Sequence, residues 1–212
     1  MSRGEPQEAE TGDVAAVVPA AGASRRMGRP KLLLPWEGST VLEATLAALL
    51  SGGADRVVVV TEPGGGILAR WPPPPRVTLA ENPTPRLGML SSVRAGLAAL
   101  AAAAAPRVLL VCPGDLPALR AETVRELLAV QRLHGGIVVP VCRGRRGHPL
   151  LVPRRWLPEI GRLEDAVGLR QLLRVAADDL LAQPVEDAGT VLDVDTPEAY
   201  ESLRAERASR RD

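Results

Sequence analysis

The residues whose types and spacing could support chemistry begin with a glycine- and arginine-rich stretch, "AAGASRRMGRPK" (Ala20 to Lys31). Gly22 and Gly28 bracket "ASRRM", and glycines let backbone N–H groups approach phosphate oxygens closely. Arginines offer forked, bidentate contacts, whereas a lysine ammonium is a compact point charge. The stretch therefore predicts a loop that binds nucleotide phosphates; a basic surface loop between a strand and a helix is the alternative.

The stretch matches neither of the two common phosphate-binding templates. It lacks G-x-G-x-x-G, and Pro30 interrupts any G-x-x-x-x-G-K-[ST] pattern, in which a hydroxyl residue would follow the lysine. An NAD-linked dehydrogenase is therefore disfavoured. Lys31 is also the only lysine, because the 26 basic residues are 25 arginines and one lysine. We expect the Lys31 ammonium to supply positive charge to a phosphate.

Acidic residues follow two later apolar segments. "PGDLP" places Asp115 after "RVLLVC", and "LDVDTPEAY" places Asp193 and Asp195 at the end of a predicted strand, before a helix. Carboxylates hold Mg²⁺ bridged to phosphate oxygens. Aspartate is also an ordinary turn residue, and either Asp195 or Thr196 could cap the helix that starts near Pro197. The joint pattern predicts a magnesium site made by Asp115 with Asp193 or Asp195.

The elements that must position these residues alternate along the chain. Continuous apolar runs predict strands over 14–19, 55–61, 76–82, 107–112, 136–141, 150–153 and 189–194. Helices are predicted over 39–53, 89–105, 121–136, 154–160, 168–176 and from 196, with a capping box of Thr40 and Glu43. This alternation predicts an α/β, three-layer Rossmann-like fold: a mostly parallel sheet with helices on both faces. Ligands of such sheets bind beyond the carboxyl ends of the strands.

Length and composition bound the remaining possibilities. The 212 residues suit one domain over 14–204, after a polar, disordered leader (1–13) without a signal peptide and before a charged tail (205–212). A net charge of +1 and 2% aromatic residues argue against a nucleic-acid partner. The longest apolar stretch is too short to span a membrane. Isolated Cys112 and Cys142 predict reduced thiols in a cytoplasmic protein, which we expect to be a monomer or a weak dimer.

The sequence resembles one family in particular. "PAAGASRRMGRPKLLLPWEGSTVLEATL" looks like the signature A-[AG]-G-x-S-x-R-M-G-x-x-K of the MobA-like nucleotidyltransferases, and "GMLSSVRAGL", "PGDLP", "RGHPLL" and "LDVDTPEAY" match further blocks in order. Ala-Ala-Gly resembles the molybdenum-cofactor cytidylyltransferases more than the guanylyltransferases. "PAAG" with paired arginines is also similar to the cytidylyltransferase of isoprenoid synthesis, which does not carry "GDLP". The resemblance implies a fold of the nucleotide-diphospho-sugar transferase type.

The resemblance also implies roles for individual residues. Three would be catalytic: Lys31, Arg26 and Asp115. The nucleotide would be bound by Ala20, Ala21, Gly22, Ser24, Arg25, Gly28, Gly88, Ser91, Ser92 and Gly114. The acceptor would be bound by Gly147, His148, Pro149, Asp165 and Arg170, and the metal by Asp115, Asp193 and Asp195. Where the family often shows G-D-x-G-A-R, this chain reads "EDAVGLRQLL", so the spacing of Asp165 and Arg170 differs by one residue.

The implied reaction is Mg²⁺-dependent transfer of a nucleoside monophosphate to a small phosphorylated acceptor such as molybdopterin cofactor. The expected donor is CTP, which would supply CMP. Pyrophosphate is released, and a dianionic phosphate needs no general base to attack. The resemblance further implies a transient contact with a molybdoenzyme or its chaperone. Two alternatives stay open: a related transferase that uses GTP or another phosphorylated acceptor, and a non-catalytic chaperone that binds the cofactor.

Overall fold

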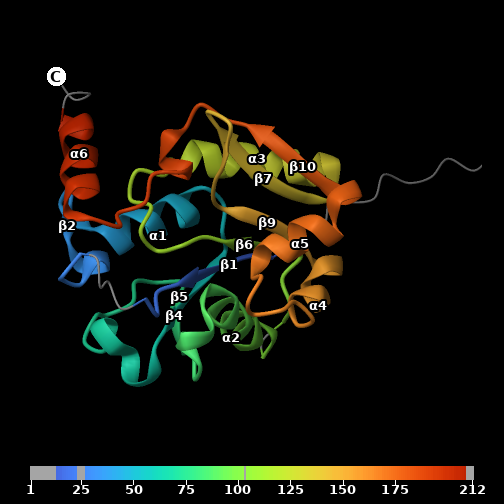
Figure 1. Ribbon diagram of the computed structural model, residues 1–212, viewed down its shortest axis with the longest axis horizontal. Coiled ribbons are helices and arrows are strands. Elements are labelled where there is room, and N and C mark those ends of the chain that lie inside the picture. Colours follow the sequence, from blue (N-terminus) through green and yellow to red (C-terminus); the bar gives the residue numbers. More distant parts are fainter. Residues whose placement is uncertain (1–12, 23–26, 103, 209–212) are drawn as a thin grey trace, which may run out of the picture.

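The computed structural model describes residues 13–22, 27–102 and 104–208, which build a central sheet between two layers of helices (Figure 1). The sheet runs in the order β10-β7-β9-β6-β1-β4-β5, with β8 paired to β7, and β2 and β3 form a separate ribbon. The strands are β1 (Val14–Pro19), β2 (Pro35–Trp36), β3 (Ser39–Thr40), β4 (Arg56–Thr61), β5 (Val77–Glu81), β6 (Val108–Val111), β7 (Ile137–Cys142), β8 (Arg145–Arg146), β9 (Leu150–Pro153) and β10 (Leu180–Pro184).

Most neighbouring strands of this sheet run parallel. β1 lies between β4 and β6 and is parallel to both, with Val17 opposite Val58 and Val111. β5 continues parallel to β4, and β10 is parallel to β7. β9 runs antiparallel to β6 and β7. The prediction of a mostly parallel sheet is confirmed.

Helices cover both faces of the sheet. The α-helices are α1 (Val41–Ser51), α2 (Met89–Ala101), α3 (Ala121–His134), α4 (Leu157–Ile160), α5 (Leu169–Val175) and α6 (Pro197–Ala208). The 3₁₀ helices are η1 (Lys31–Leu33), η2 (Pro63–Leu68), η3 (Pro85–Leu87), η4 (Arg154–Trp156), η5 (Ala177–Asp179) and η6 (Ala188–Thr190). Alternate residues of β1 enter opposite cores, because Ala16 packs with α1 and α3 whereas Val17 packs with α2, α4 and α5. The three-layer prediction is confirmed.

Local hydrogen bonds explain where two of the helices start. Thr40 Oγ1 accepts from the N–H of Glu43 at 3.3 Å, and the Glu43 carboxylate accepts from the N–H of Thr40 at 2.9 Å, which confirms the predicted capping box of α1. α3 is instead capped from a distant segment. The buried Asp187 carboxylate accepts from the N–H of Arg120 at 3.0 Å and from the hydroxyl of Thr123 at 2.9 Å.

Two sequence-based expectations are wrong in detail. Helix α2 ends at Ala101, earlier than the predicted 105. The strand expected over 189–194 is absent from these described residues: η6 occupies 188–190, and the chain then continues without regular structure. Loops take its backbone groups, because Thr190 O accepts from the N–H of His148 and Val194 N–H donates to Asp115 O. The strand at this edge of the sheet is β10. Its last residue, Pro184, is tolerated because an edge strand does not need every backbone N–H for pairing.

The predicted domain bounds, 14 and 204, stay a prediction. Residues 1–12 of the expected leader and 209–212 of the expected tail lie outside the described residues. Asp13, the last residue of that leader, forms an ion pair with Arg56 at 2.5 Å, and α6 continues past 204 to Ala208. No helix in the described part of the chain is both long enough and apolar enough to cross a bilayer.

The close approach of α2 to the sheet gives a test of this packing. A Cβ at Gly96 would lie 2.6 Å from Val17 Cγ1 and 2.9 Å from Val60 Cγ2. Overpacking costs about 1–3 kcal/mol, whereas alanine gains up to about 1 kcal/mol over glycine in a helix. Gly96→Ala should therefore lower the free energy of unfolding in urea by about 1 kcal/mol. Exposed Ala99→Ser on the same helix should change it by less than about 0.5 kcal/mol; equal stability of the two variants would contradict the packing.

Candidate active site

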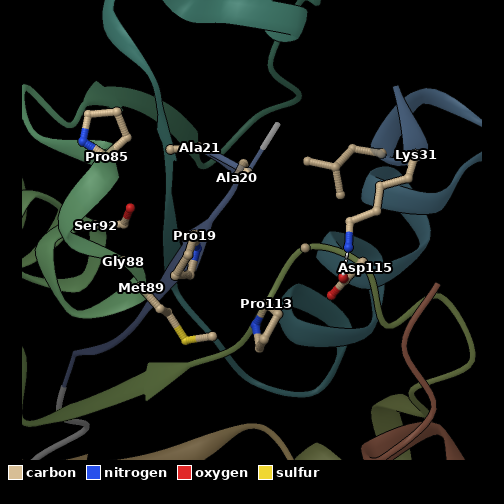
Figure 2. A pocket seen from close by; sticks show the side chains of 13 residues that line it. Pro19, Ala20, Ala21, Lys31, Pro85, Gly88, Met89, Ser92, Pro113 and Asp115 are labelled. Atoms are coloured by element: carbon tan, nitrogen blue, oxygen red, sulfur yellow. Dashed lines mark hydrogen bonds and ion pairs between the residues drawn. The ribbon is translucent and has the colours of Figure 1, made fainter. Parts of the chain in front are cut away.

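A cavity of about 240 Å³ lies where the carboxyl ends of β1 and β6 meet the start of α2 (Figure 2). Because the two strands are parallel neighbours, the loops that follow them emerge side by side. The cavity is lined by Pro19, Ala20, Ala21, Gly22, Lys31, Leu32, Pro85, Gly88, Met89, Ser92, Pro113, Gly114 and Asp115. Residues from three separate parts of the sequence thus share one hollow.

Most of the described residues predicted to bind nucleotide lie in this lining. They are Ala20, Ala21, Gly22, Gly88, Ser92 and Gly114. Gly28 lies in an exposed turn outside the lining, with a φ of 67° that favours glycine. Ser91 also lies outside it and is buried. Ser24, Arg25 and the predicted catalytic Arg26 fall outside the described residues.

Ser91 supports the wall of the cavity from behind. The buried Asn82 side-chain amide donates to Ser91 Oγ at 2.8 Å and to Ser92 Oγ at 3.0 Å, and Ser91 Oγ donates to Gly88 O at 2.7 Å. These bonds fix the start of the 13-residue helix α2, which faces the cavity through Gly88 and Met89. A helix N-terminus favours anions such as phosphate. The sequence analysis missed Asn82, although an asparagine directly after a strand was an available signal.

Lys31 and three aspartates form the charged part of the site. Lys31 Nζ lies 2.5 Å from Asp115 Oδ2 and 2.6 Å from Asp195 Oδ1. The carboxylates of Asp115, Asp193 and Asp195 each offer an oxygen within 4.8 Å of the other two. Figure 2 shows the Lys31 amine directed at the Asp115 carboxylate. The structure therefore brings the predicted lysine and all three predicted metal ligands together.

Two hydrogen bonds place the aspartates. Val194 N–H donates to Asp115 O at 3.0 Å, which joins the segment before α6 to the turn after β6. Thr196 caps α6, because its Oγ1 accepts from the N–H of Ala199 at 3.2 Å. Of the two capping candidates in the sequence, Thr196 therefore takes the role, and the Asp195 carboxylate faces Lys31.

The electrostatics of this cluster are those of a site that attracts cations. Burial acts to lower the pKa of Lys31, but Asp115 and Asp195 outweigh it and raise that pKa. The pKa of Asp115 is raised, because burial and the nearby Asp193 and Asp195 carboxylates together outweigh the lowering by Lys31. Among the described residues, buried Asp115 Oδ1 has no hydrogen-bond partner. Three converging carboxylates with an unsatisfied oxygen fit a hard divalent cation such as Mg²⁺.

A second cavity of about 600 Å³ adjoins the first, since Met89 lines both. Of the residues predicted to bind the acceptor, its lining includes Gly147, His148, Asp165 and Arg170, whereas Pro149, after a cis peptide bond, lies outside it. The other lining residues are Leu90, Val139, Arg146, Leu150, Val167, Gly168, Leu169, Leu173 and Arg174. Arg146 lies on this lining although it is exposed, and neither Arg146 nor Arg174 was among the predicted site residues.

Internal contacts fix parts of this second cavity. His148 N–H donates to Thr190 O at 2.8 Å, and burial lowers the pKa of its imidazole. Gly147 has no room for a side chain, because a Cβ would lie 2.4 Å from Thr190 O. Asp165 forms an ion pair with Arg94 at 2.6 Å. Asp165 therefore anchors the loop before α5 to α2.

Known proteins of similar sequence cover most of the chain. The chain is 28% identical to the molybdenum cofactor cytidylyltransferase of Escherichia coli K12 over 184 residues, covering 87% of this chain and 92% of that protein. It is 33% identical to the nicotine blue oxidoreductase of Paenarthrobacter nicotinovorans over 195 residues, covering 87% and 93%.

Solved structures show the same fold. Rv0371c of Mycobacterium tuberculosis H37Rv superimposes with a TM-score of 0.78 at 26% identity, covering 91% of this chain and 98% of that one. A complex of Rv0371c with manganese gives a TM-score of 0.69, also at 26% identity, covering 90% and 97%. Residues 16–185 match the family model of the MobA-like NTP transferase domain. The chain therefore belongs to the MobA-like nucleotidyltransferase family and is a nucleotidyltransferase.

Proposed function

We propose that the enzyme transfers CMP from CTP to a small phosphorylated acceptor of the molybdopterin-cofactor type, with Mg²⁺, and releases pyrophosphate. The observation that carries the proposal is the position of Lys31 and Asp115 on the lining of the first cavity, which adjoins a second, arginine-bearing cavity. The Escherichia coli relative named for cytidylyl transfer to molybdenum cofactor supports this donor and acceptor, as does the Ala-Ala-Gly at Ala20–Gly22.

The first cavity offers what a nucleoside triphosphate needs. The backbone of Ala20 and Ala21 would face the base, and the start of α2 at Gly88 would contact the nucleoside. Lys31 and Arg26 would hold the triphosphate, with Lys31 nearest the α-phosphate. This assignment places the lysine charge where negative charge builds up during attack.

The chemistry needs positioning and charge neutralisation more than proton transfer. An acceptor phosphate is largely dianionic near neutral pH, since its second pKa is about 6, and can attack the α-phosphorus directly. His148, whose pKa is lowered by burial, would be neutral there and would not be required as a base. Asp115 with Asp193 and Asp195 would hold the Mg²⁺, which when bound neutralises and orients phosphate oxygens.

The second cavity suits an anionic acceptor with an apolar portion. Arg146, Arg170 and Arg174 supply positive charge on its lining, and Leu169 and Leu173 supply apolar surface. Arginine forks are the side chains that bind phosphate in a bidentate manner. Because Met89 lines both cavities, an acceptor phosphate at their boundary would lie close to the nucleotide.

The catalytic roles of Lys31 and Asp115 can be tested by substitution. Lys31→Ala and Asp115→Asn should each lower kcat for pyrophosphate release by about 10²–10³, as for loss of one group that stabilises a transition state. The rates are measured at saturating Mg²⁺, CTP and acceptor. Arg125→Ala, which removes an exposed charge on α3, is the matched control and should keep the wild-type rate. A near-wild-type rate in either site variant would remove that residue from the catalytic group.

The choice of nucleotide can be tested with CTP, GTP, ATP and UTP, each with molybdopterin cofactor, in the presence and absence of Mg²⁺. We expect pyrophosphate release with CTP at the highest kcat/KM and none without a divalent cation. Higher kcat/KM with GTP would show a guanylyltransferase instead. Tight cofactor binding without turnover of any nucleotide would show the chaperone alternative.

The acceptor role of the second cavity has its own prediction. Arg170→Ala and Arg146→Ala should each raise the KM for the phosphorylated acceptor by about 10- to 100-fold, the range expected for losing one charge-assisted hydrogen bond. The KM for CTP should change little, because both arginines line only the second cavity. A rise in the KM for CTP with an unchanged KM for the acceptor would contradict this assignment.

A further inference from the structure

The Lys31 ammonium lies inside the acidic cluster that would hold the metal. It contacts Asp115 at 2.5 Å and Asp195 at 2.6 Å, and both carboxylates belong to the group whose oxygens lie within 4.8 Å of one another. Lys31 and Asp115 are mostly buried, with 16% and 11% of their side chains exposed. Of the three carboxylates, Asp115 is buried, Asp195 is half-buried and Asp193 is exposed. A buried carboxylate requires positive charge nearby, and in this structure Lys31 supplies it.

The lysine and a divalent cation would compete for the same carboxylates. Mg²⁺ binds carboxylate oxygens at about 2.0–2.1 Å, so a cation bound to Asp115 and Asp195 would lie close to an ammonium that is held by the same two side chains. Two cations held by the same pair of carboxylates would also repel each other strongly in a partly buried setting. The lysine does not neutralise the cluster completely, since Asp115 Oδ1 has no hydrogen-bond partner among the described residues.

We propose that Lys31 is an exchangeable internal counter-ion: it occupies Asp115 and Asp195 in the free enzyme, and it leaves them when a divalent cation enters. Lys31 also lines the cavity assigned to the nucleotide, so a triphosphate there offers its ammonium another anionic partner. Nucleotide binding then strengthens metal binding, and the free enzyme binds the metal weakly. This inference rests on the metal site of the proposed function, but not on turnover.

The first experiment measures Mn²⁺ binding to the enzyme without nucleotide, by electron paramagnetic resonance of the free ion. Lys31→Met, which keeps the unbranched stem of the side chain but removes its charged amine, should bind Mn²⁺ at least about tenfold more tightly than the wild type. Arg29→Met is the matched control, because it removes an equal charge two residues away, where Arg29 stacks on Tyr200. Its affinity should stay within about threefold of the wild type.

Each other outcome of that experiment overturns the inference. Equal affinities of Lys31→Met and wild type would show that lysine and metal do not compete. Weaker or absent binding by Lys31→Met would show that the lysine supports the metal site. Equal tightening by Arg29→Met would show a general effect of net charge.

The second experiment uses the wild-type chain and so does not depend on the folding of a variant. Because Lys31 is the only lysine, selective ¹³C,¹⁵N-lysine labelling gives one lysine side-chain signal in an NMR spectrum. Mg²⁺ should move that signal, with a midpoint equal to the dissociation constant of the metal. A signal that does not move when the site is filled overturns the inference. If Mg²⁺ displaces Lys31 but no nucleotide gives pyrophosphate release, only the proposed function is contradicted.

Discussion

The ion pairs of Lys31 with Asp115 and Asp195 are the interaction on which the rest of the site depends. A carboxylate as buried as Asp115 is costly unless a positive charge compensates it. The compensating charge is that of Lys31, which follows β1. Asp195, the second carboxylate that Lys31 contacts, comes from the segment before α6. The segment before α6 is held by the Val194–Asp115 backbone bond, and α6 by the bond from the Tyr200 hydroxyl to Pro35 O at 2.5 Å.

Helix capping decides which side chains are available for chemistry. Because Thr196 caps α6, the Asp195 carboxylate faces Lys31. Asp187, also buried, is used differently: it accepts bonds at the start of α3 and from the N–H of Gly189 at 3.0 Å. Two aspartates eight residues apart thus serve opposite purposes. Residue type does not distinguish their roles, because both are aspartates. The roles differ because the fold places different partners beside each carboxylate.

The predictable part of the structure follows from local sequence. In apolar runs such as "VAAVVP" and "DRVVVVT", side chains on both faces of a strand are apolar and are buried in a sheet that helices cover on both sides. β1 and β4 were therefore identified correctly. The segment after 189 has the same apolar pattern, but its backbone is bonded to the loops at His148 and Asp115. Asn82 and Arg174 were missed for a related reason. Their surroundings depend on contacts between elements that local periodicity does not encode.

The two cavities differ in how closely sequence can specify their ligands. The first is lined largely by prolines and small residues such as Pro19, Ala20 and Gly114, so a base bound there as proposed would be recognised mostly by backbone N–H and C=O groups. Similar sequences can therefore bind different bases. The second cavity is lined by side chains of the 165–174 segment, in which this chain departs by one residue from the family spacing. Changes in that segment alter the charge and shape of the cavity directly, so the side proposed for the acceptor is where members of one fold can diverge most readily in function.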